Sequence, residues 1–273
     1  MSFIFIDGSY FCFYRYFSLL TWWKNAFPED PILGDPYDNP IFVEKFKKMC
    51  IQSLENIPKK LGLSKDMDYK IFIGKDCKRE DIWRLEFYKE YKMTRIHNLY
   101  ISSFFKILYN EVDGLFVKND IKNDIKNEVM SILEYPHLEA DDCIALSILA
   151  NKSIDKNIYI ITSDNDYMQL LEDNQNIQIW NLAFKQISAG KNGQEELFCK
   201  IVQGDNSDNI PAVLKKCGPK TAQKCYQNPD YFQERLNKEN ALEKYNLNKL
   251  LIDFNNIPSY LVEEYLKKYN NTV

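Results

Sequence analysis

Histidine is scarce in this 273-residue sequence, which contains only His97 and His137, and its seven cysteines never form a Cys-x-x-Cys pair. The sequence thus argues against a zinc site built from histidine and cysteine, and against a Ser-His-Asp triad. The cysteines are odd in number and widely scattered, so no disulfide framework is indicated. A reducing, intracellular compartment suits such a chain best.

Long apolar runs are also missing. No run approaches the roughly 20 residues that a membrane-spanning helix needs. The first residues lead directly into an apolar segment, without the basic region of a signal peptide. We therefore expect a soluble protein that is not exported. Its 45% hydrophobic content allows one sizeable core with a small helical addition.

An excess of positive charge is absent as well, since the formal net charge is −4. Taken alone, this value argues against a nucleic-acid partner, because binding a polyanion depends on Lys and Arg. Basic residues nevertheless crowd into two stretches, namely Lys78, Arg79, Arg84, Lys89, Lys92 and Arg95, and then Lys215, Lys216, Lys220 and Lys224. Local charge of this kind can attract phosphates even in an acidic protein.

Four short apolar runs have the length and composition of strands, at residues 2–6, 69–73, 157–161 and 177–181. Helical patterns lie between them, most clearly at 42–61 and 139–150. Strands that alternate with helices predict an α/β fold in which a mostly parallel sheet is covered on both faces.

Three further stretches have a different character. Residues 27–40 are rich in proline, which predicts a loop. The charged and aromatic segment from 79 to about 127 contains no obvious strand, and it is either a helical insertion or partly mobile. From about residue 195 onward no strand is indicated, so we expect a helical C-terminal portion.

Acidic residues follow the predicted strands at the point where each strand ends. Asp7 follows the first strand, Asp76 the second, and Asp164 and Asp166 the third. The carboxyl ends of parallel strands share one edge of a sheet, and ligands bind there. The sequence therefore predicts that these carboxylates converge.

A further acidic group, Glu139, Asp141 and Asp142, opens the predicted helix at 139–150. Acids at such positions can be ordinary turn or cap residues. That explanation accounts for one acid, whereas many carboxylates packed together without cations would repel one another or take up protons. Oxygen ligands without histidine or cysteine favour Mg²⁺ or Mn²⁺. Two such ions about 3.5–4 Å apart would activate a water and stabilise the leaving oxygen of a phosphodiester.

Residues 204–211 and 217–222 have the form of two helices joined by a tight loop. Such a loop can direct backbone N–H groups and a helix N-terminus at a phosphate. The alternative is an ordinary connector whose lysines lie in water.

Five motifs in this order resemble the bacterial and bacteriophage 5′-3′ exonuclease and flap endonuclease family. They are FIDGS at 5–9 with YRYF at 14–17, Asp76 followed by WR at 83–84 and YKMTR at 91–95, LEADD at 138–142, SDND at 163–166 and GDNSDNIP at 204–211. The resemblance covers most of the chain. It implies a PIN-like α/β catalytic domain at 1–194 with a helical arch at about 77–127, and a helical helix–three-turn–helix region at 195–273 that binds duplex DNA.

The resemblance also implies roles for individual residues. One Mg²⁺ would be held by Asp7, Asp76, Glu139, Asp141 and Asp142, and a second by Asp164, Asp166, Asp205 and Asp208, with Mn²⁺ able to substitute. Lys92 and Arg95, at helical spacing in the arch, would contact the scissile phosphate. DNA contacts would come from Tyr14, Arg15, Arg84, Lys215, Lys216, Lys220 and Thr221, with the tyrosine stacking on a frayed base.

The sequence departs from the family pattern at two places. The hairpin has PAV at 211–213 where the family has Pro-Gly-Val, and the following stretch at 214–217 is one residue longer. Whether the loop carbonyls form a K⁺ site is therefore open. Around Asp76, the sequence GKDC at 74–77 permits a small alignment shift.

The implied function is that of a structure-specific 5′ nuclease, acting as a separate monomer without a membrane partner. Its substrates would be DNA with a 5′ flap, nick or overhang, and RNA–DNA primer junctions. One alternative is a PIN-type endoribonuclease, but this alternative does not explain the function of residues 204–222. The other is a catalytically inactive DNA-binding paralogue, although every expected motif keeps its acids.

Overall fold

The computed structural model describes residues 1–32, 34–63, 67–95, 100–112, 130–151, 156–171 and 176–269. Its centre is one five-stranded parallel sheet with the strand order β3-β2-β1-β4-β5. The strands are β1 (Ser2–Asp7), β2 (Tyr69–Gly74), β3 (Met130–Leu133), β4 (Asn157–Ile161) and β5 (Ile177–Trp180). The predicted α/β class is confirmed, and four strands begin where the sequence predicted them.

The edge strand β3 was not predicted. It is four residues long, contains a serine, and pairs only with β2. A run this short gives neither clear alternation nor a continuous apolar stretch. Its place in the sheet is therefore set by tertiary pairing.

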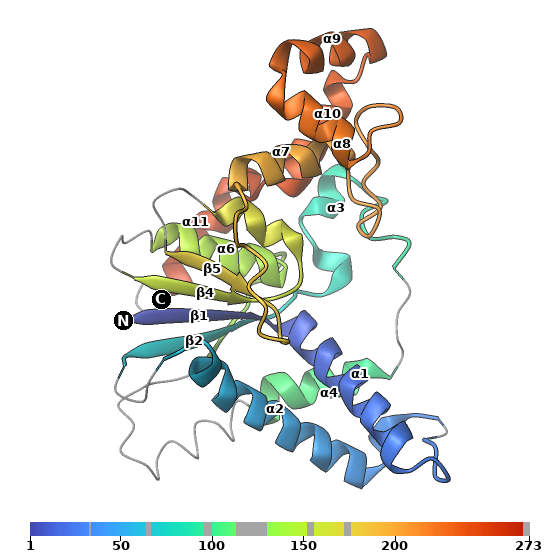
Figure 1. Cartoon of the computed structure of the whole chain (residues 1–273), viewed down its shortest axis with the longest axis vertical. Coiled ribbons are helices and arrows are strands. Elements are labelled where there is room, and N and C mark those ends of the chain that lie inside the picture. Colours follow the sequence, from blue (N-terminus) through green and yellow to red (C-terminus); the bar gives the residue numbers. More distant parts are fainter. Residues whose placement is uncertain are drawn as a thin grey trace.

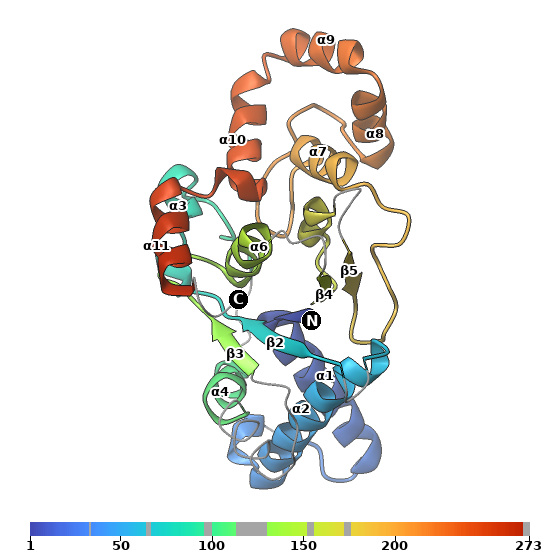
Figure 2. The same ribbon diagram turned by 90° about the vertical axis from the view of Figure 1, so that its left-hand side faces the viewer.

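Helices cover both faces of the sheet (Figures 1 and 2). On one face lie α1 (Gly8–Ala26), α2 (Pro40–Lys60) and α4 (Ile101–Lys106), and on the other lie α6 (Ala140–Ala150) and α11 (Ser259–Tyr269). The side chains of β1 alternate between two hydrophobic clusters, with Ile4 and Ile6 in the first and Phe3 and Phe5 in the second. Both faces of the sheet are therefore buried against hydrophobic side chains, as expected of a parallel sheet.

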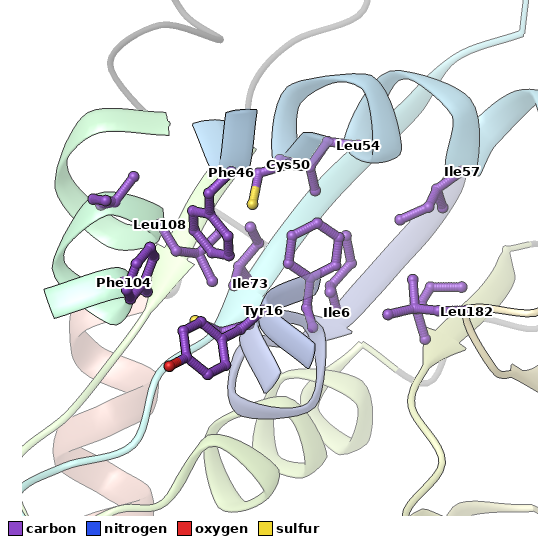
Figure 3. Packing of buried hydrophobic residues seen from close by; sticks show 14 of the residues in the cluster. Ile6, Tyr16, Phe46, Cys50, Leu54, Ile57, Ile73, Phe104, Leu108 and Leu182 are labelled. Atoms are coloured by element: carbon purple, nitrogen blue, oxygen red, sulfur yellow. The ribbon is translucent and has the colours of Figure 1, made fainter. Parts of the chain in front are cut away.

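The cluster under α1, α2 and α4 is shown in Figure 3. The ring of Phe104 is fully buried, and its centroid lies 5.0 Å from that of Tyr16 and 4.9 Å from that of Phe46. The α4 helix comes from the segment that the sequence left as an insertion. Part of that segment is thus integral to the core.

The other described parts of the predicted arch at 77–127 are short pieces. The structure describes η2 (Arg79–Asp81), α3 (Arg84–Phe87), consecutive turns at 89–94, and a π-helix, η3 (Ile107–Val112), that continues α4. Residues 96–99 and 113–129 of the predicted arch lie outside the described residues. Within the predicted loop at 27–40, the described residues contain only the short η1 (Pro36–Asp38) before α2 begins.

A group of helices follows the sheet, as predicted. It comprises α7 (Gly193–Gln203), α8 (Pro219–Gln227), α9 (Pro229–Glu239) and α10 (Leu242–Ile252). These helices enclose a separate small core with Val202, Leu214 and Phe232 at its centre. The last helix, α11, returns to pack on α6 (Figure 2). No helix in the described ranges is long and apolar enough to cross a membrane.

We predict that Phe104→Ala lowers the free energy of unfolding by about 3–5 kcal/mol, because it opens a cavity between α1 and α2. Urea unfolding followed by circular dichroism measures this. As a control, Phe87→Ala removes a ring that is 48% exposed and should cost no more than about 1 kcal/mol. Similar losses in both variants would contradict the placement of α4 in the core.

Candidate metal centre

A cavity of 270 Å³ opens where β1, β2 and β4 end and α6 begins. The acidic residues that line it are Asp7, Asp76, Glu139, Asp141 and Asp164. The structure therefore brings together five of the nine predicted carboxylates, from four separate stretches of the chain. Lys92 and Arg95 line the same cavity.

Local structure fixes the first two carboxylates. Asp7 caps α1 by accepting a hydrogen bond from the Tyr10 N–H at 3.0 Å, and it accepts a second from the Thr162 hydroxyl at 3.1 Å. Asp76 accepts from the Ala140 N–H at 2.8 Å and from the Ser9 hydroxyl. Each carboxylate is thus held by hydrogen bonds from other parts of the chain.

The negative charges of the carboxylates in this cavity repel one another. Burial raises the pKa of Asp7 to about 7, and the negative charges of Asp76 and Asp164 act in the same direction. Burial, followed by the charges of Asp142 and Glu139, raises the pKa of Asp141 well above its usual range. These carboxylates would hold protons unless a cation lay among them.

This donor set fits a hard divalent cation. The lining offers carboxylate oxygens and hydroxyls without imidazole or thiolate. A divalent ion here would let the buried acids ionise together, which the protein's own charges do not achieve. Asp7, Asp76, Asp141 and Asp164 are the residues that would hold it. Asp164 was expected at the second ion, but it lines this cavity instead.

Glu139 is the exception among the acids, because protein cations already surround it. It accepts hydrogen bonds from the Arg84 guanidinium at 3.0 Å, from the Tyr91 hydroxyl at 2.9 Å and from the Lys92 ammonium. Although burial favours the protonated form, the Lys92 and Arg84 charges hold the pKa of Glu139 at about 2.

Arg84 and Asp142 form a buried ion pair behind the cavity. Arg84 is 2% exposed, and its guanidinium donates to the two Asp142 oxygens at 2.8 and 2.7 Å and to the Leu251 carbonyl at 2.7 Å. The Trp83 indole donates to the same carboxylate at 3.0 Å. The expectation that Arg84 contacts DNA is wrong, because the side chain is enclosed by protein.

Asp142 was expected to bind metal together with Glu139 and Asp141. One oxygen of each of these carboxylates lies within 4.8 Å of the others, so the spacing allows a shared ion. Asp142 does not line the cavity, however, and both of its oxygens already accept hydrogen bonds from Arg84. Its contacts are those of a residue that orients Arg84 and the start of α6.

A second acidic group, Asp166, Asp205 and Asp208, also has ligand atoms within 4.8 Å of one another. The Lys200 ammonium lies between two of them, 2.7 Å from an Asp205 oxygen and in contact with Asp166. Burial and the charge of Asp164 raise the pKa of Asp166 to about 7, and Lys200 opposes this shift. Burial also favours protonation of Asp205, but Lys200 and Ser207 lower its pKa to about 2.

Lys200 was missed at the sequence level. It occupies the last turn of α7, five residues before Asp205. A lysine placed shortly before an acidic loop could have signalled an ion pair, but its second partner, Asp166, comes from a distant stretch of the chain.

Lys92 and Arg95 do not lie at helical spacing, so that expectation is wrong. They belong to consecutive turns, and Lys92 has a φ of 57°. Lys92 pairs with Glu139 and lies 3.8 Å from an Asp208 oxygen, and Arg95 pairs with the other Asp208 oxygen. The two cations thus connect both acidic groups.

Two other residues expected to bind DNA, Tyr14 and Arg15, belong to α1 beside the acidic cavity. Tyr14 lines an aromatic groove of 630 Å³ along α1 that shares Tyr10 and Phe13 with the acidic cavity. Arg15 is half-buried, with its guanidinium 5.0 Å from the centre of the Tyr14 ring.

The remaining predicted DNA contacts lie at the α7–α8 hairpin. Lys215, Lys216 and Lys220 are exposed there, and Thr221 donates its N–H to the Gly218 carbonyl at 3.0 Å. Lys216 has a φ of 53°, in the region that glycine favours. In the stretch at 211–217 that departs from the family pattern, a lysine rather than a glycine therefore adopts this left-handed backbone conformation.

Comparisons with known proteins agree with this arrangement. Residues 2–203 match the family model of the 5′-3′ exonuclease N-terminal resolvase-like domain. The chain is 27% identical to the ribonuclease H of Enterobacteria phage T4, over 88% of this chain and 82% of that protein. It is 30% identical to a 5′-3′ exonuclease of Buchnera aphidicola subsp. Acyrthosiphon pisum, over 80% of both chains.

Solved structures share the fold. A T5 protein crystallised with metal ions superposes with a TM-score of 0.63 at 15% identity, covering 98% of both chains. A bacteriophage T5 flap endonuclease in complex with DNA and metal ions superposes with a TM-score of 0.58 at 16% identity, covering 98% of this chain and 97% of that one.

An α/β sheet with an oxygen-ligand site at its carboxyl edge, together with these relatives, defines a nuclease whose acidic cavity fits a divalent metal ion. More particularly, the chain belongs to the 5′-3′ exonuclease family. This confirms the resemblance drawn from the sequence motifs.

We predict that Arg84→Ala lowers the free energy of unfolding by about 3–5 kcal/mol, because it leaves the buried Asp142 carboxylate without its counter-charge. Urea unfolding measures the loss. In the control Lys191→Ala, the exposed pair with Glu196 is broken, and the cost should be about 0–1 kcal/mol. Equal costs in the two variants would contradict a structural role for Arg84.

We also predict that Mg²⁺ stabilises the protein more at about pH 8 than at about pH 5.5. The pKa values of Asp7 and Asp166 are raised to about 7, so the metal-free protein loses stability as pH rises from about 4 to 7 and these groups ionise. Binding requires the ionised forms and therefore releases protons. Thermal unfolding with Mg²⁺ or with chelator measures this difference, and an equal rise in Tm at both pH values would exclude it.

Proposed function

We propose that this enzyme is a structure-specific 5′ nuclease that removes 5′ ends and flaps from branched, nicked or overhanging DNA, including RNA–DNA primer junctions. The observation that carries the proposal is the direct connection between the acidic cavity and the α7–α8 hairpin. Lys92 and Arg95 contact acids of both, and the hairpin bears three exposed lysines. A nuclease for single-stranded RNA would not need such a hairpin.

Two Mg²⁺ ions, or Mn²⁺ in their place, would supply the hydrolytic water and charge stabilisation at the phosphodiester. Asp7, Asp76, Asp141 and Asp164 would hold the first. Asp166, Asp205 and Asp208 would hold the second, which requires Lys200 to move aside, since its ammonium lies among their oxygens.

Lys92 and Arg95 would bind the scissile phosphate. In the structure Lys92 pairs with Glu139 and Arg95 pairs with Asp208. An incoming phosphate would accept the same kind of charge-assisted hydrogen bond from each cation. Exchanging carboxylate for phosphate would hold the phosphate over the cavity and offset charge that develops during cleavage.

Lys215, Lys216, Lys220 and Thr221 would grip the duplex backbone, and Tyr14 would stack on a base near the cut, with Arg15 beside it. We further propose that the catalytic domain spans 1–194 with the arch at 77–127 apart from α4, that the duplex-binding region spans 195–273 apart from α11, which packs on α6, and that the protein acts as a monomer.

The test uses end-labelled 5′-flap, nicked-duplex and single-stranded RNA substrates, with Mg²⁺ or with chelator. We predict Mg²⁺-dependent release of 5′ fragments from the flap. Asp164→Asn should reduce kcat by at least about 100-fold while leaving the Kd for the flap within about tenfold, because losing a metal ligand removes transition-state stabilisation more than backbone contacts.

Asp230→Asn is the matched control, since Asp230 is an exposed acid in the first turn of α9, and it should keep full activity. Full activity in Asp164→Asn would refute the metal assignment. Cleavage of single-stranded RNA alone would point to an endoribonuclease, and binding without cleavage would point to an inactive paralogue.

A further inference from the structure

The loop at residues 205–210, here called the hairpin loop, is a closed unit. Asp205 and Ile210 exchange backbone hydrogen bonds of 2.8 and 2.7 Å across it. The Asp205 carboxylate also accepts from the Ser207 N–H at 2.7 Å and from the Ser207 hydroxyl at 2.6 Å. These bonds fix the loop from within.

The hairpin loop is also joined firmly to the helices around it. A side chain at Gly204, which has a φ of 71°, would come within 2.4 Å of the Ile210 carbonyl oxygen. The Asn248 amide donates to the Ile201 carbonyl at 3.0 Å and to the Pro211 carbonyl at 2.8 Å. These hydrogen bonds join the end of the loop to α7 and α10.

On its other side the hairpin loop contacts residues 88–95, here called the cationic segment, which carries Lys92 and Arg95. The segment consists of turns rather than a regular helix, so its own hydrogen bonds fix it only weakly. The Lys92 N–H donates to the Asp208 carbonyl at 2.9 Å, and Arg95 Nε donates to the Ser207 carbonyl at 3.2 Å. The loop thus helps to position the two cations, together with Arg79, whose guanidinium donates to the Lys92 and Arg95 carbonyls.

Asn209 also joins the hairpin loop to the cationic segment, and its partners there, Tyr88 and Glu90, do not line the acidic cavity. Its side-chain amide donates to the Glu90 carbonyl at 2.9 Å, and its own carbonyl accepts from the Tyr88 hydroxyl at 2.9 Å. A φ of 60° turns both groups of this residue toward the cationic segment. Asparagine tolerates this left-handed conformation better than most residues with a side chain.

We propose that Asn209 is a positioning residue through which duplex binding at the α7–α8 hairpin sets Lys92 and Arg95 for the reaction. This inference rests on the proposed function, because it assumes that the hairpin grips duplex. It makes the rate on branched DNA depend on a residue that contacts neither metal nor phosphate. A displacement of about 1 Å in groups that position a substrate can cost about 100-fold in rate.

Asn209→Gly tests this directly. Glycine accepts the φ of 60° without strain, so the variant removes the amide while keeping the loop backbone. Tyr88→Phe removes the hydrogen bond to the Asn209 carbonyl from the opposite partner, together with the contact of 3.2 Å between the hydroxyl and the Glu90 carboxylate. Asn240→Gly is the matched control, because Asn240 also has a positive φ, of 48°, at the end of α9.

Steady-state kinetics on a 5′-flap duplex and on a single-stranded DNA of the same 5′ sequence provide the readout. We expect Asn209→Gly to lower kcat on the flap by about tenfold with KM within about twofold, while the slower cleavage of single-stranded DNA is unchanged. Tyr88→Phe should likewise lower kcat on the flap relative to kcat on the single strand. The fold-loss of kcat on the flap in the double variant should be smaller than the product of the fold-losses in the two single variants. Asn240→Gly should match the wild type.

Equal losses on both substrates would overturn the inference, since they would indicate general damage to the site. A rise in KM alone, or no change, would overturn it as well. A wild type that cleaves the flap no faster than the single strand would refute the proposed function itself. The wild-type rates on both substrates are therefore measured before those of any variant.

Discussion

Repulsion among carboxylates at one edge of the sheet is the constraint on which the rest of the site depends. A parallel sheet buried on both faces leaves its carboxyl edge as the place where strand-end side chains can reach solvent and ligand. Asp7, Asp76 and Asp164 occupy that edge, and α6 adds Glu139 and Asp141. Charges this close cannot all ionise unless cations lie among them.

The protein supplies some of these cations itself. Arg84 neutralises Asp142 from behind, Lys92 pairs with Glu139, and Lys200 lies between Asp166 and Asp205. Asp7 and Asp141 receive no such partner among the described residues, and their pKa values are raised. The acids that lack a protein cation are therefore the natural ligands of the first divalent ion.

The same ion pairs tie the sheet to the helical hairpin. The Tyr91 hydroxyl contacts Glu139 at 2.9 Å and Asp208 at 3.0 Å, and so joins the start of α6 to the hairpin loop. Around it, Ile82, Ile201 and Ile210 form a small buried cluster. The acidic cavity and the hairpin proposed to bind duplex thus share one connected set of contacts.

Much of this arrangement could be predicted, because strand ends are readable from apolar runs and the acids come directly after them. The edge strand β3 and the helix α1 could not. The former is too short for a pattern, and α1 is aromatic on several sides, so it presents no simple apolar stripe.

The role of Arg84 was mistaken for a related reason. An arginine in a basic stretch resembles a phosphate contact, whereas its burial depends on the Leu251 carbonyl, which lies 167 residues away in the sequence. Pairings at such separation, like that of Lys200 with Asp166, are decided by the fold rather than by local pattern.

Binding of Mn²⁺, followed by electron paramagnetic resonance near pH 8, tests most directly whether the carboxylates gather to hold cations. We expect two bound ions per chain, magnetically coupled because the proposed two-ion arrangement would place them about 3.5–4 Å apart, and loss of that coupling in Asp164→Asn. Binding of no more than a single weak ion, unaffected by that substitution, would contradict the metal centre described here.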